Sequence, residues 1–376
     1  MKVCIIAGRE FFDPFDQRLF KEAKSLVKFD HDVTLLTPDK ENKIVEVDGF
    51  KVICIKKSNK LGLTSYNILR TAKRLGSDVY HCHEFDTLIP GTLLKILTKK
   101  RIIYDSHEDY PRLVYEISKK KFNRFFVDMI ERISSRFMDQ IITIDKTMAD
   151  RYSRFNKNVL ILRNYPQLEY FTGQKKPVEL EKMIDTDKDF IFVYVGNISL
   201  KRGILVMLSA MEMVIKRHKN VKLLLIGMYH DEESKRKTLD FIKAKDLERN
   251  VIFSGWVDYR ELAGYLSVAD AAISLLQPLP RLKTIFPSKL FEYLITKKPI
   301  IISNFQNLKQ MVDSLGCGLT VNPTDAKQVA EAMLYLVEHP KEARAMGESG
   351  FSIAKKKYTW EVQERDLMKI YERFEK

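Results

Sequence analysis

The sequence predicts an α/β fold built from two parallel-sheet lobes. Short runs of β-branched and aromatic residues alternate with amphipathic segments of helical length along the chain, a pattern typical of parallel strands joined by crossover helices. With 376 residues the chain is longer than one ordinary core needs and long enough for two. A polar, irregular stretch at 173–188 separates two series of strands, so we expect a Rossmann-like lobe on each side of it.

The first series of strands predicts a lobe over residues 1–170. Helical segments fall between most of its strands. The exception is 45–55, where Asp48-Gly49 between apolar alternations indicates a hairpin and therefore an antiparallel excursion. The expected strands are 3–7, 32–37, 51–55, 78–83, 101–106, 140–145 and 159–163.

The second series predicts a lobe over residues 171–350. After Pro340 the chain reads as helix to its end, which is more than this lobe needs, so we expect 351–376 to return to the first lobe. Two such lobes open their strand ends on one crevice, and we expect ligands there. The expected strands are 190–196, 221–227, 251–254, 271–276, 299–303 and 319–321.

The charge and composition limit the partners. A net charge of +14 suits a nucleic acid, an anionic membrane or a phosphorylated substrate, and residues 51–100 hold ten basic and three acidic side chains. Because both lobes are basic and the cations are not concentrated on one helix, a nucleic-acid or scaffold protein is the weaker interpretation. No apolar run approaches the roughly 18 residues of a spanning helix, and the N-terminus lacks a signal-peptide pattern.

The cysteines indicate a reducing compartment. They have no close pairs and no C-x-x-C spacing, so we expect reduced core thiols and a cytoplasmic protein. The four are Cys4, Cys54, Cys82 and Cys317.

In the second lobe, the segment from Gly196 to Gly203 runs from a strand end through a polar turn into a helix. Lys201 and Arg202 lie in the turn. The N–H groups and dipole at a helix start attract a phosphate, which either cation would help to neutralise. The plain alternative is a strand end without a ligand.

A second helix start in this lobe carries Ser288, Lys289 and Glu292. We expect Ser288 to cap the helix, and Lys289 and Glu292 to share one face of an exposed first turn. A diphosphate would meet Lys289, while Glu292 would accept hydrogen bonds from ribose hydroxyls. The alternative is a surface salt bridge.

In the first lobe, two strands run into polar residues at 78–84 and 104–111, where loops face the crevice. We expect His81 and His83 to point to opposite sides of their strand. A zinc site from these two and His107 is a weaker alternative, because we consider such a pair a poor chelate.

Two further segments of this lobe precede helices. Asp13-Pro14 and Asp16 come before the first helix, which Asp16 is placed to cap. Farther on, apolar residues recur at helical spacing, and we expect this stripe to pack against the sheet. The run Lys119-Lys120-Lys121 precedes it and favours anionic lipid. The stripe comprises Phe122, Phe125, Phe126, Met129, Ile130, Ile133 and Phe137.

With these segments described, the chain resembles the retaining glycosyltransferases of family 4, which have the GT-B architecture, over almost its whole length. The matching pieces keep the family's order. They are Asp16-Gln17-Arg18 with Glu22-Ala23, D-V-x-H-x-H at 78–83, Y-D-S-H-E-D-Y-P at 104–111, R-N-Y-P at 163–166, 196–203, F-S-G-W-V at 253–257, P-x-K-L-F-E-Y at 287–293, P-I-I at 299–301 and G-C-G at 316–318.

The resemblance implies a nucleotide sugar, most simply a UDP-sugar, on the second lobe, an acceptor on the first, and transfer with retention and no metal or other cofactor. The catalytic candidates are His107, Arg202 and Lys289, with His107 orienting a substrate and not acting as a nucleophile. The other donor-site candidates are Gly196, Asn197, Gly255, Trp256, Thr284, Ser288 and Glu292. The acceptor-side candidates are Asp16, Arg18, His83 and Glu108.

Three positions depart from the family pattern. Asn197 and Arg202 replace the Arg and Lys of the phosphate loop, and Thr284 stands where a Glu would contact the donor sugar. The expected acceptor is a lipid-linked or cell-surface polysaccharide precursor, met at the inner face of the cell membrane, with no role for nucleic acid. The alternative within this architecture is a nucleotide-sugar epimerase.

Overall fold

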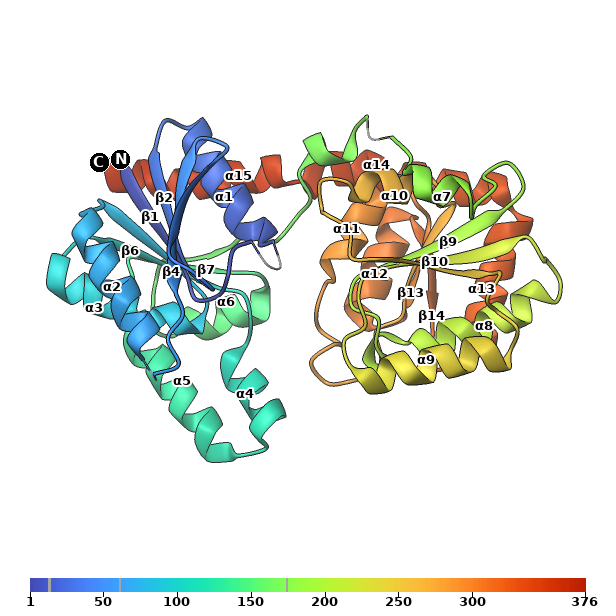
Figure 1. Ribbon diagram of the computed structural model, residues 1–376, viewed down its shortest axis with the longest axis horizontal. Coiled ribbons are helices and arrows are strands. Elements are labelled where there is room, and N and C mark those ends of the chain that lie inside the picture. The colour runs from blue at the N-terminus through green and yellow to red at the C-terminus, as the bar shows by residue number, and fades with distance from the viewer. Residues whose placement is uncertain (13–14, 61, 174) are drawn as a thin grey trace. The chain divides into compact units, whose positions relative to one another are not determined.

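The computed structural model describes residues 1–12, 15–60, 62–173 and 175–376, which pack as two compact units (Figure 1). Unit 1 comprises Met1–Asn164 and Gln363–Lys376, and unit 2 comprises Tyr165–Val362. The units divide at 164/165 and 362/363, whereas the sequence pattern suggested 170 and 350. Asp13 and Pro14 lie outside the described residues.

Unit 1 is built on an eight-stranded sheet in the order β3-β4-β2-β1-β5-β6-β7-β8. Its neighbouring strands pair in parallel except β3 and β4, which form the antiparallel hairpin expected at Asp48-Gly49. The strands are β1 (Lys2–Ala7), β2 (Asp32–Asp39), β3 (Lys43–Val47), β4 (Phe50–Lys56), β5 (Val79–His83), β6 (Arg101–Ser106), β7 (Gln140–Thr143) and β8 (Val159–Ile161). The helices are α1 (Gln17–Lys28), α2 (Leu63–Leu75), η1 (Phe85–Thr87), α3 (Leu88–Thr98), α4 (Tyr110–Ser118), α5 (Lys121–Ser135), α6 (Lys146–Tyr152) and α15 (Trp360–Glu375).

Unit 2 is built on a six-stranded parallel sheet in the order β11-β10-β9-β12-β13-β14. The prediction of two α/β lobes with parallel sheets is therefore confirmed. The strands are β9 (Phe190–Val195), β10 (Val221–Ile226), β11 (Val251–Gly255), β12 (Ala271–Ser274), β13 (Ile300–Ser303) and β14 (Gly318–Val321). The helices are η2 (Leu168–Phe171), α7 (Val178–Glu181), η3 (Leu200–Arg202), α8 (Ile204–Ile215), α9 (Glu232–Ala244), α10 (Leu262–Ser267), α11 (Ser288–Ile295), α12 (Gln306–Leu315), α13 (Ala326–Glu338) and α14 (Pro340–Lys357).

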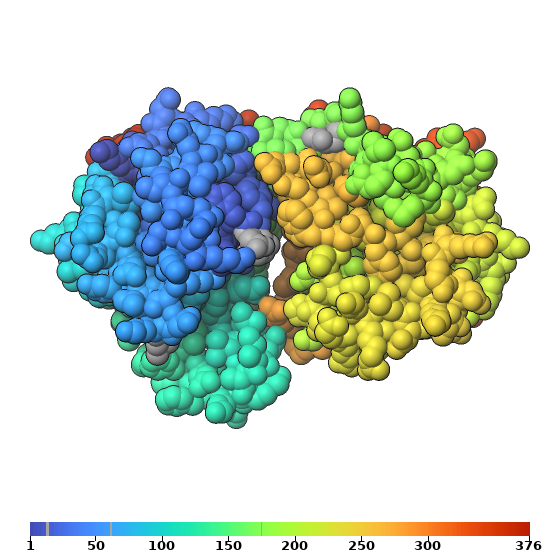
Figure 2. Space-filling model, in the orientation of Figure 1, coloured from blue at the N-terminus to red at the C-terminus, as the bar shows by residue number. Residues whose placement is uncertain are grey.

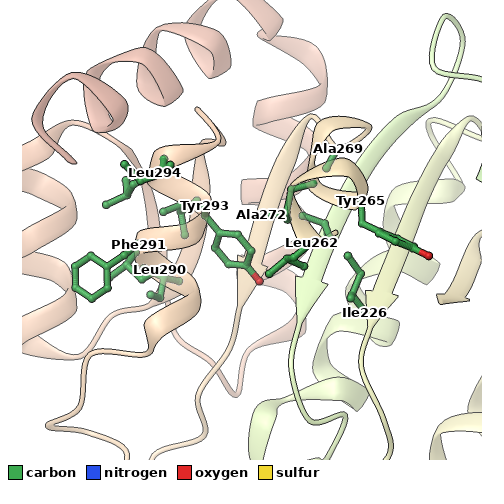
Figure 3. Packing of buried hydrophobic residues seen from close by; sticks show 14 of the residues in the cluster. Ile226, Leu262, Tyr265, Ala269, Ala272, Leu290, Phe291, Tyr293 and Leu294 are labelled. Atoms are coloured by element: carbon green, nitrogen blue, oxygen red, sulfur yellow. The ribbon is translucent and has the colours of Figure 1, made fainter. Parts of the chain in front are cut away.

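Helix α11 is fixed by the core of unit 2. Leu290 and Leu294 are fully buried in this core with Leu262 of α10 (Figure 3), and each such side chain contributes roughly 1.5–3 kcal/mol. The Tyr293 hydroxyl accepts a hydrogen bond of 2.9 Å from the Val195 N–H at the end of β9. The first turn of α11 is thereby held against the carboxyl end of the central strands.

Helix α5 contradicts the expected packing of its apolar stripe. Phe122 and Phe125 are 75% and 65% exposed, whereas Glu131 and Ser135 are buried. The reason is that the inner side of α5 is held by polar contacts, since the Tyr152 hydroxyl donates to Glu131 Oε1 at 2.7 Å. Most of the stripe therefore does not pack against the sheet, although its member Ile130 contacts the core of unit 1.

All four cysteines are free and buried, as the sequence predicts. Burial raises the pKa of Cys82 to about 12, so its thiol stays protonated. No helix among the described residues combines the length and apolar character needed to cross a membrane.

Candidate active site

In unit 2, two glycines let the backbone close tightly around the end of β9. Gly196 has φ 117°, and a Cβ on Gly227 would lie 2.3 Å from the Gly196 carbonyl oxygen. A Cβ on Gly196 would itself lie 2.7 Å from Lys289 Nζ. The glycine at 196 therefore brings the main chain directly onto the ammonium of Lys289.

Lys289 is buried, in contrast to the exposed helix start that the sequence suggested. Its Nζ lies 4.1 Å from the centroid of the Tyr194 ring. Burial and then the charge of Arg202 lower its pKa to about 7, although Glu292 acts in the opposite direction. Among the described residues no hydrogen-bond acceptor for this Nζ is seen, so the site presents a desolvated ammonium suited to an anion.

The start of α11 differs from the expected capping. The N-cap is Pro287, with φ −67° and ψ 134°, and no side chain caps this end. Ser288 is the first helical residue and lies one position after the N-cap, so its hydroxyl does not cap the helix. Glu292 lies one turn deeper and is also buried, which excludes the alternative of a surface salt bridge with Lys289.

The remaining donor-site candidates lie on loops. Asn197 is exposed, and its carbonyl accepts from the Tyr194 hydroxyl at 2.8 Å. Trp256 follows Gly255 (φ 73°) and is 57% exposed. Thr284 is exposed and donates to the Arg281 carbonyl at 3.3 Å. The structure thus brings Gly196, Arg202, Lys289 and Glu292 together, while the described contacts of Trp256 and Thr284 do not join them to this group.

In unit 1, the buried guanidinium of Arg18 joins α1 to the end of β6 and to the segment after β8. Its Nε donates to Asp105 Oδ2 at 2.8 Å and lies 3.1 Å from Glu22 Oε1. Its Nη1 donates to the Leu162 carbonyl at 2.8 Å. Arg18 is therefore a buried positioning group.

The histidines of β5 point to the same side of the strand, contrary to the sequence expectation. Residues i and i+2 of a strand share a face, and the rings of His81 and His83 stack with centroids 4.5 Å apart. Burial lowers the pKa of each to about 3, so both are neutral. The Tyr371 hydroxyl of α15 lies 2.9 Å from His81 Nδ1, and Glu22 Oε2 lies 3.1 Å from His83 Nε2.

His107 is the charged histidine of this group. Its Nδ1 lies 3.0 Å from Glu84 Oε1, and its Nε2 lies 3.4 Å from Asp105 Oδ1 and 3.3 Å from His83 Nδ1. Burial acts to lower its pKa, but the charge of Asp105 and the hydrogen bonds to Asp105 and Glu84 prevail and raise it to about 10. A protonated imidazole with both nitrogens engaged cannot serve as a base or nucleophile.

Glu84 belongs to this site, and the sequence analysis did not find it. Its φ of 70° and ψ of 163° fall in a region that almost only glycine adopts, at a cost of roughly 1–3 kcal/mol. This backbone directs the carboxylate to His107 and to Arg9 Nη2 at 3.4 Å. Because the residue at this position is a glutamate and not a glycine, the sequence gives no signal for such a conformation.

The two acidic acceptor-side candidates lie at the edge of this network. Asp16 caps α1 as expected, accepting from the Arg18 and Leu19 N–H groups at 3.0 and 3.1 Å. It also accepts from Arg9 Nε at 2.9 Å. Glu108 is half-buried, and its carbonyl accepts from the Ser106 hydroxyl at 3.3 Å.

The buried cluster has some features of a metal site. Ligand atoms of Glu22, His81, His83 and Asp105 lie within 4.8 Å of one another. Arg18, however, already supplies a positive charge to both carboxylates. Burial raises the pKa of Glu22 to about 7, although the charge of Arg18 acts in the opposite direction. Both carboxylates are therefore already paired with Arg18.

Comparisons with known proteins agree with this architecture. Residues 18–163 match the profile described as Glycosyltransferase Family 4, and residues 177–352 match that described as Glycosyl transferases group 1. An uncharacterized glycosyltransferase of Methanocaldococcus jannaschii is 22% identical over 93% of this chain and 91% of its own length.

Solved structures share the fold over nearly the full length. Sucrose-phosphate synthase from Thermosynechococcus elongatus aligns with a TM-score of 0.78 and 19% identity, covering 99% of both chains. HepE of Anabaena, in complex with UDP-glucose, aligns with a TM-score of 0.75 and 12% identity, again covering 99% of both. From the two matched regions and this shared architecture, the chain belongs to the family 4 glycosyltransferases of the GT-B fold.

Proposed function

We propose that the chain transfers a hexosyl group from a UDP-sugar to a lipid-linked or cell-surface polysaccharide precursor, with retention of anomeric configuration and without a metal. The observation that carries the donor assignment is the buried ammonium of Lys289 packed beneath Gly196. A diphosphate provides the anion that this group lacks. The binding of UDP-glucose by HepE supports uridine as the nucleoside.

In the proposed reaction the bond between the anomeric carbon and the β-phosphate oxygen breaks, and its electron pair stays on UDP. The acceptor hydroxyl oxygen bonds to the same carbon on the same face, and its proton passes to the departing phosphate oxygen. Negative charge therefore grows on the diphosphate, where Lys289 and Arg202 stabilise it most in the transition state. Glu292 would accept hydrogen bonds from the ribose.

In unit 1, His107 is the residue proposed to meet the acceptor or the sugar. Its pKa of about 10 makes it a fixed positive charge, and Glu84 and Asp105 hold its ring. Arg18 and His83 are proposed as positioning residues, because Arg18 pairs with Asp105 and His83 Nδ1 lies 3.3 Å from His107 Nε2. We infer that the protein works at the inner face of the cell membrane.

Donor binding tests the proposal. Thermal unfolding of the purified chain is measured with UDP, UDP-glucose and GDP-mannose, and stabilisation by the uridine compounds is expected. Lys289→Ala should abolish that stabilisation, whereas Lys309→Ala, an exposed lysine on α12, should preserve it. Indifference of the wild type to every nucleotide sugar would remove the donor assignment.

The reaction class needs a second measurement. Incubation with donor and acceptor, followed by NMR of the product, should give the anomeric configuration of the donor. A sugar epimerised in the absence of acceptor would favour the epimerase.

A further inference from the structure

The outer face of α5 is an exposed apolar stripe. It comprises Phe122, Phe125, Phe126, Met129, Ile133 and, just beyond the helix, Phe137, all of them between 37% and 75% exposed. Within the helix each of these residues has another three or four positions away, so they lie on one face. Figure 2 shows the α4–α5 segment, in teal, at the surface.

The orientation of α5 is fixed from its other side. Glu131 is buried, accepts from Tyr152 and pairs with Arg151. At the end of the helix, Asn156 Nδ2 donates to the Ser135 carbonyl at 2.8 Å. Turning the stripe inward would break these contacts, so its exposure is a property of the fold.

Helix α3, which packs against α5, extends the apolar area. Its Ile89, Leu93, Ile96 and Leu97 are between 40% and 55% exposed and share one face at helical spacing. We call these four and the six stripe residues of α5 the α3–α5 surface. Exposed apolar areas of this extent on soluble monomers mark interaction sites.

Cations are concentrated at one end of this surface. Lys119, Lys120 and Lys121 are exposed, and no ion pair is seen for them within the part of the chain that the structure describes. The basic residues of 51–100 differ, because several are neutralised. Lys57 Nζ lies 2.8 Å from Glu10, Lys95 Nζ 2.7 Å from Asp139 and Lys100 Nζ 3.0 Å from Asp78.

We propose that unit 1 docks on an anionic phospholipid bilayer by inserting the α3–α5 surface into the interface while Lys119–Lys121 bind the headgroups. An amphipathic helix with aromatic residues on its apolar face and lysines beside it suits this position. A second copy of the chain is less suitable, because the exposed Lys119–Lys121 favour an anionic partner and the chain itself has a net charge of +14. The inference deepens the proposed function by naming the surface that meets a lipid-linked acceptor.

Vesicle sedimentation of the full chain tests the docking. The wild type should bind vesicles of phosphatidylcholine mixed with phosphatidylglycerol, release them at high salt and ignore phosphatidylcholine alone. Replacing each of Lys119, Lys120 and Lys121 by Ala should weaken binding by about fivefold per residue. Phe122→Asp with Phe126→Asp should abolish binding, whereas Ile44→Asp, at a site 68% exposed on β3, should leave it unchanged.

Two results would overturn the proposal. One is equal behaviour of wild type and all variants toward both vesicle types. The other is a wild-type dimer that the Phe122→Asp, Phe126→Asp variant converts to a monomer, because a second copy would then cover the surface. The variants should keep the wild-type stabilisation by UDP, so a failure of docking is separable from a failure of the donor assignment.

Discussion

The buried ammonium of Lys289 should lower the stability of the fold, and its removal should raise it. Its pKa falls from 10.5 to about 7 on folding, which at about 1.36 kcal/mol per unit corresponds to an upper bound of about 5 kcal/mol. Lys289→Met keeps most of the side-chain volume but loses the contact with the Tyr194 ring and the charge opposite Glu292. We therefore expect a net gain of ~1–3 kcal/mol in the free energy of unfolding.

The gain should depend on pH with a defined sign. Below pH 7 Lys289 is charged in both states, so the full cost of burial is present. Between pH 7 and 10.5 the folded state binds fewer protons than the unfolded state, and wild-type stability rises with pH relative to the variant. Urea unfolding of both proteins near pH 6 and near pH 9 measures this difference.

Donor affinity should change in the opposite direction to stability. Loss of a charge-assisted phosphate contact should weaken UDP binding by ~2–4 kcal/mol, which isothermal titration measures. A variant that is less stable than the wild type at both pH values and binds UDP normally would refute the reasoning.

Three further predictions concern the same two sites. Gly196→Ala should cost ~1–3 kcal/mol of stability, because φ is 117°, and should weaken UDP binding by displacing Lys289 Nζ. Gly173→Ala, at φ 71° with open space around it, is its control and should leave UDP binding intact. Glu84→Gly should relieve the strained backbone and lower the pKa of His107 in an NMR titration, with loss of transfer, whereas Glu84→Gln should lower that pKa and keep the strain. Transfer, followed as UDP release, should persist in excess EDTA.

Opposite outcomes are equally informative for these three. Normal UDP binding by Gly196→Ala would mean that the loop at Gly196 does not contribute to binding the diphosphate. An unchanged His107 pKa in both Glu84 variants would leave Asp105 as the group that holds its charge. If EDTA abolishes transfer and a divalent ion restores it, a metal ion would take the place of Lys289 and Arg202 as the group that neutralises the diphosphate.

Much of the fold could be predicted because local pattern and global packing agree. The apolar strand runs, the hairpin signal at Asp48-Gly49 and the capping role of Asp16 each depend on a few neighbouring residues. Helical structure after Pro340 was also expected, although it is interrupted between Lys357 and Trp360, where α14 ends and α15 begins. Local signals are sufficient for such features.

The candidate site was predicted less completely, because burial depends on distant segments. The spacing of Lys289 and Glu292 indicates a shared face but not that Gly196 and Tyr194 enclose the ammonium. The outward direction of α5 follows from Glu131 meeting Arg151, a contact that periodicity alone does not reveal. The stacking of His81 and His83 was available from strand geometry and was misjudged.

The C-terminal helix gives unit 1 a particular order of assembly during translation. Residues 363–376 belong to this unit, and Tyr371 contacts His81 in its buried network. Unit 2 is continuous in the chain and has all of its residues as soon as Val362 has been made. Unit 1, although synthesised first, must wait for the whole of unit 2 before its last helix can dock. A chain released after residue 362 would therefore carry all the residues of unit 2 together with an N-terminal unit that is still open to proteases and chaperones.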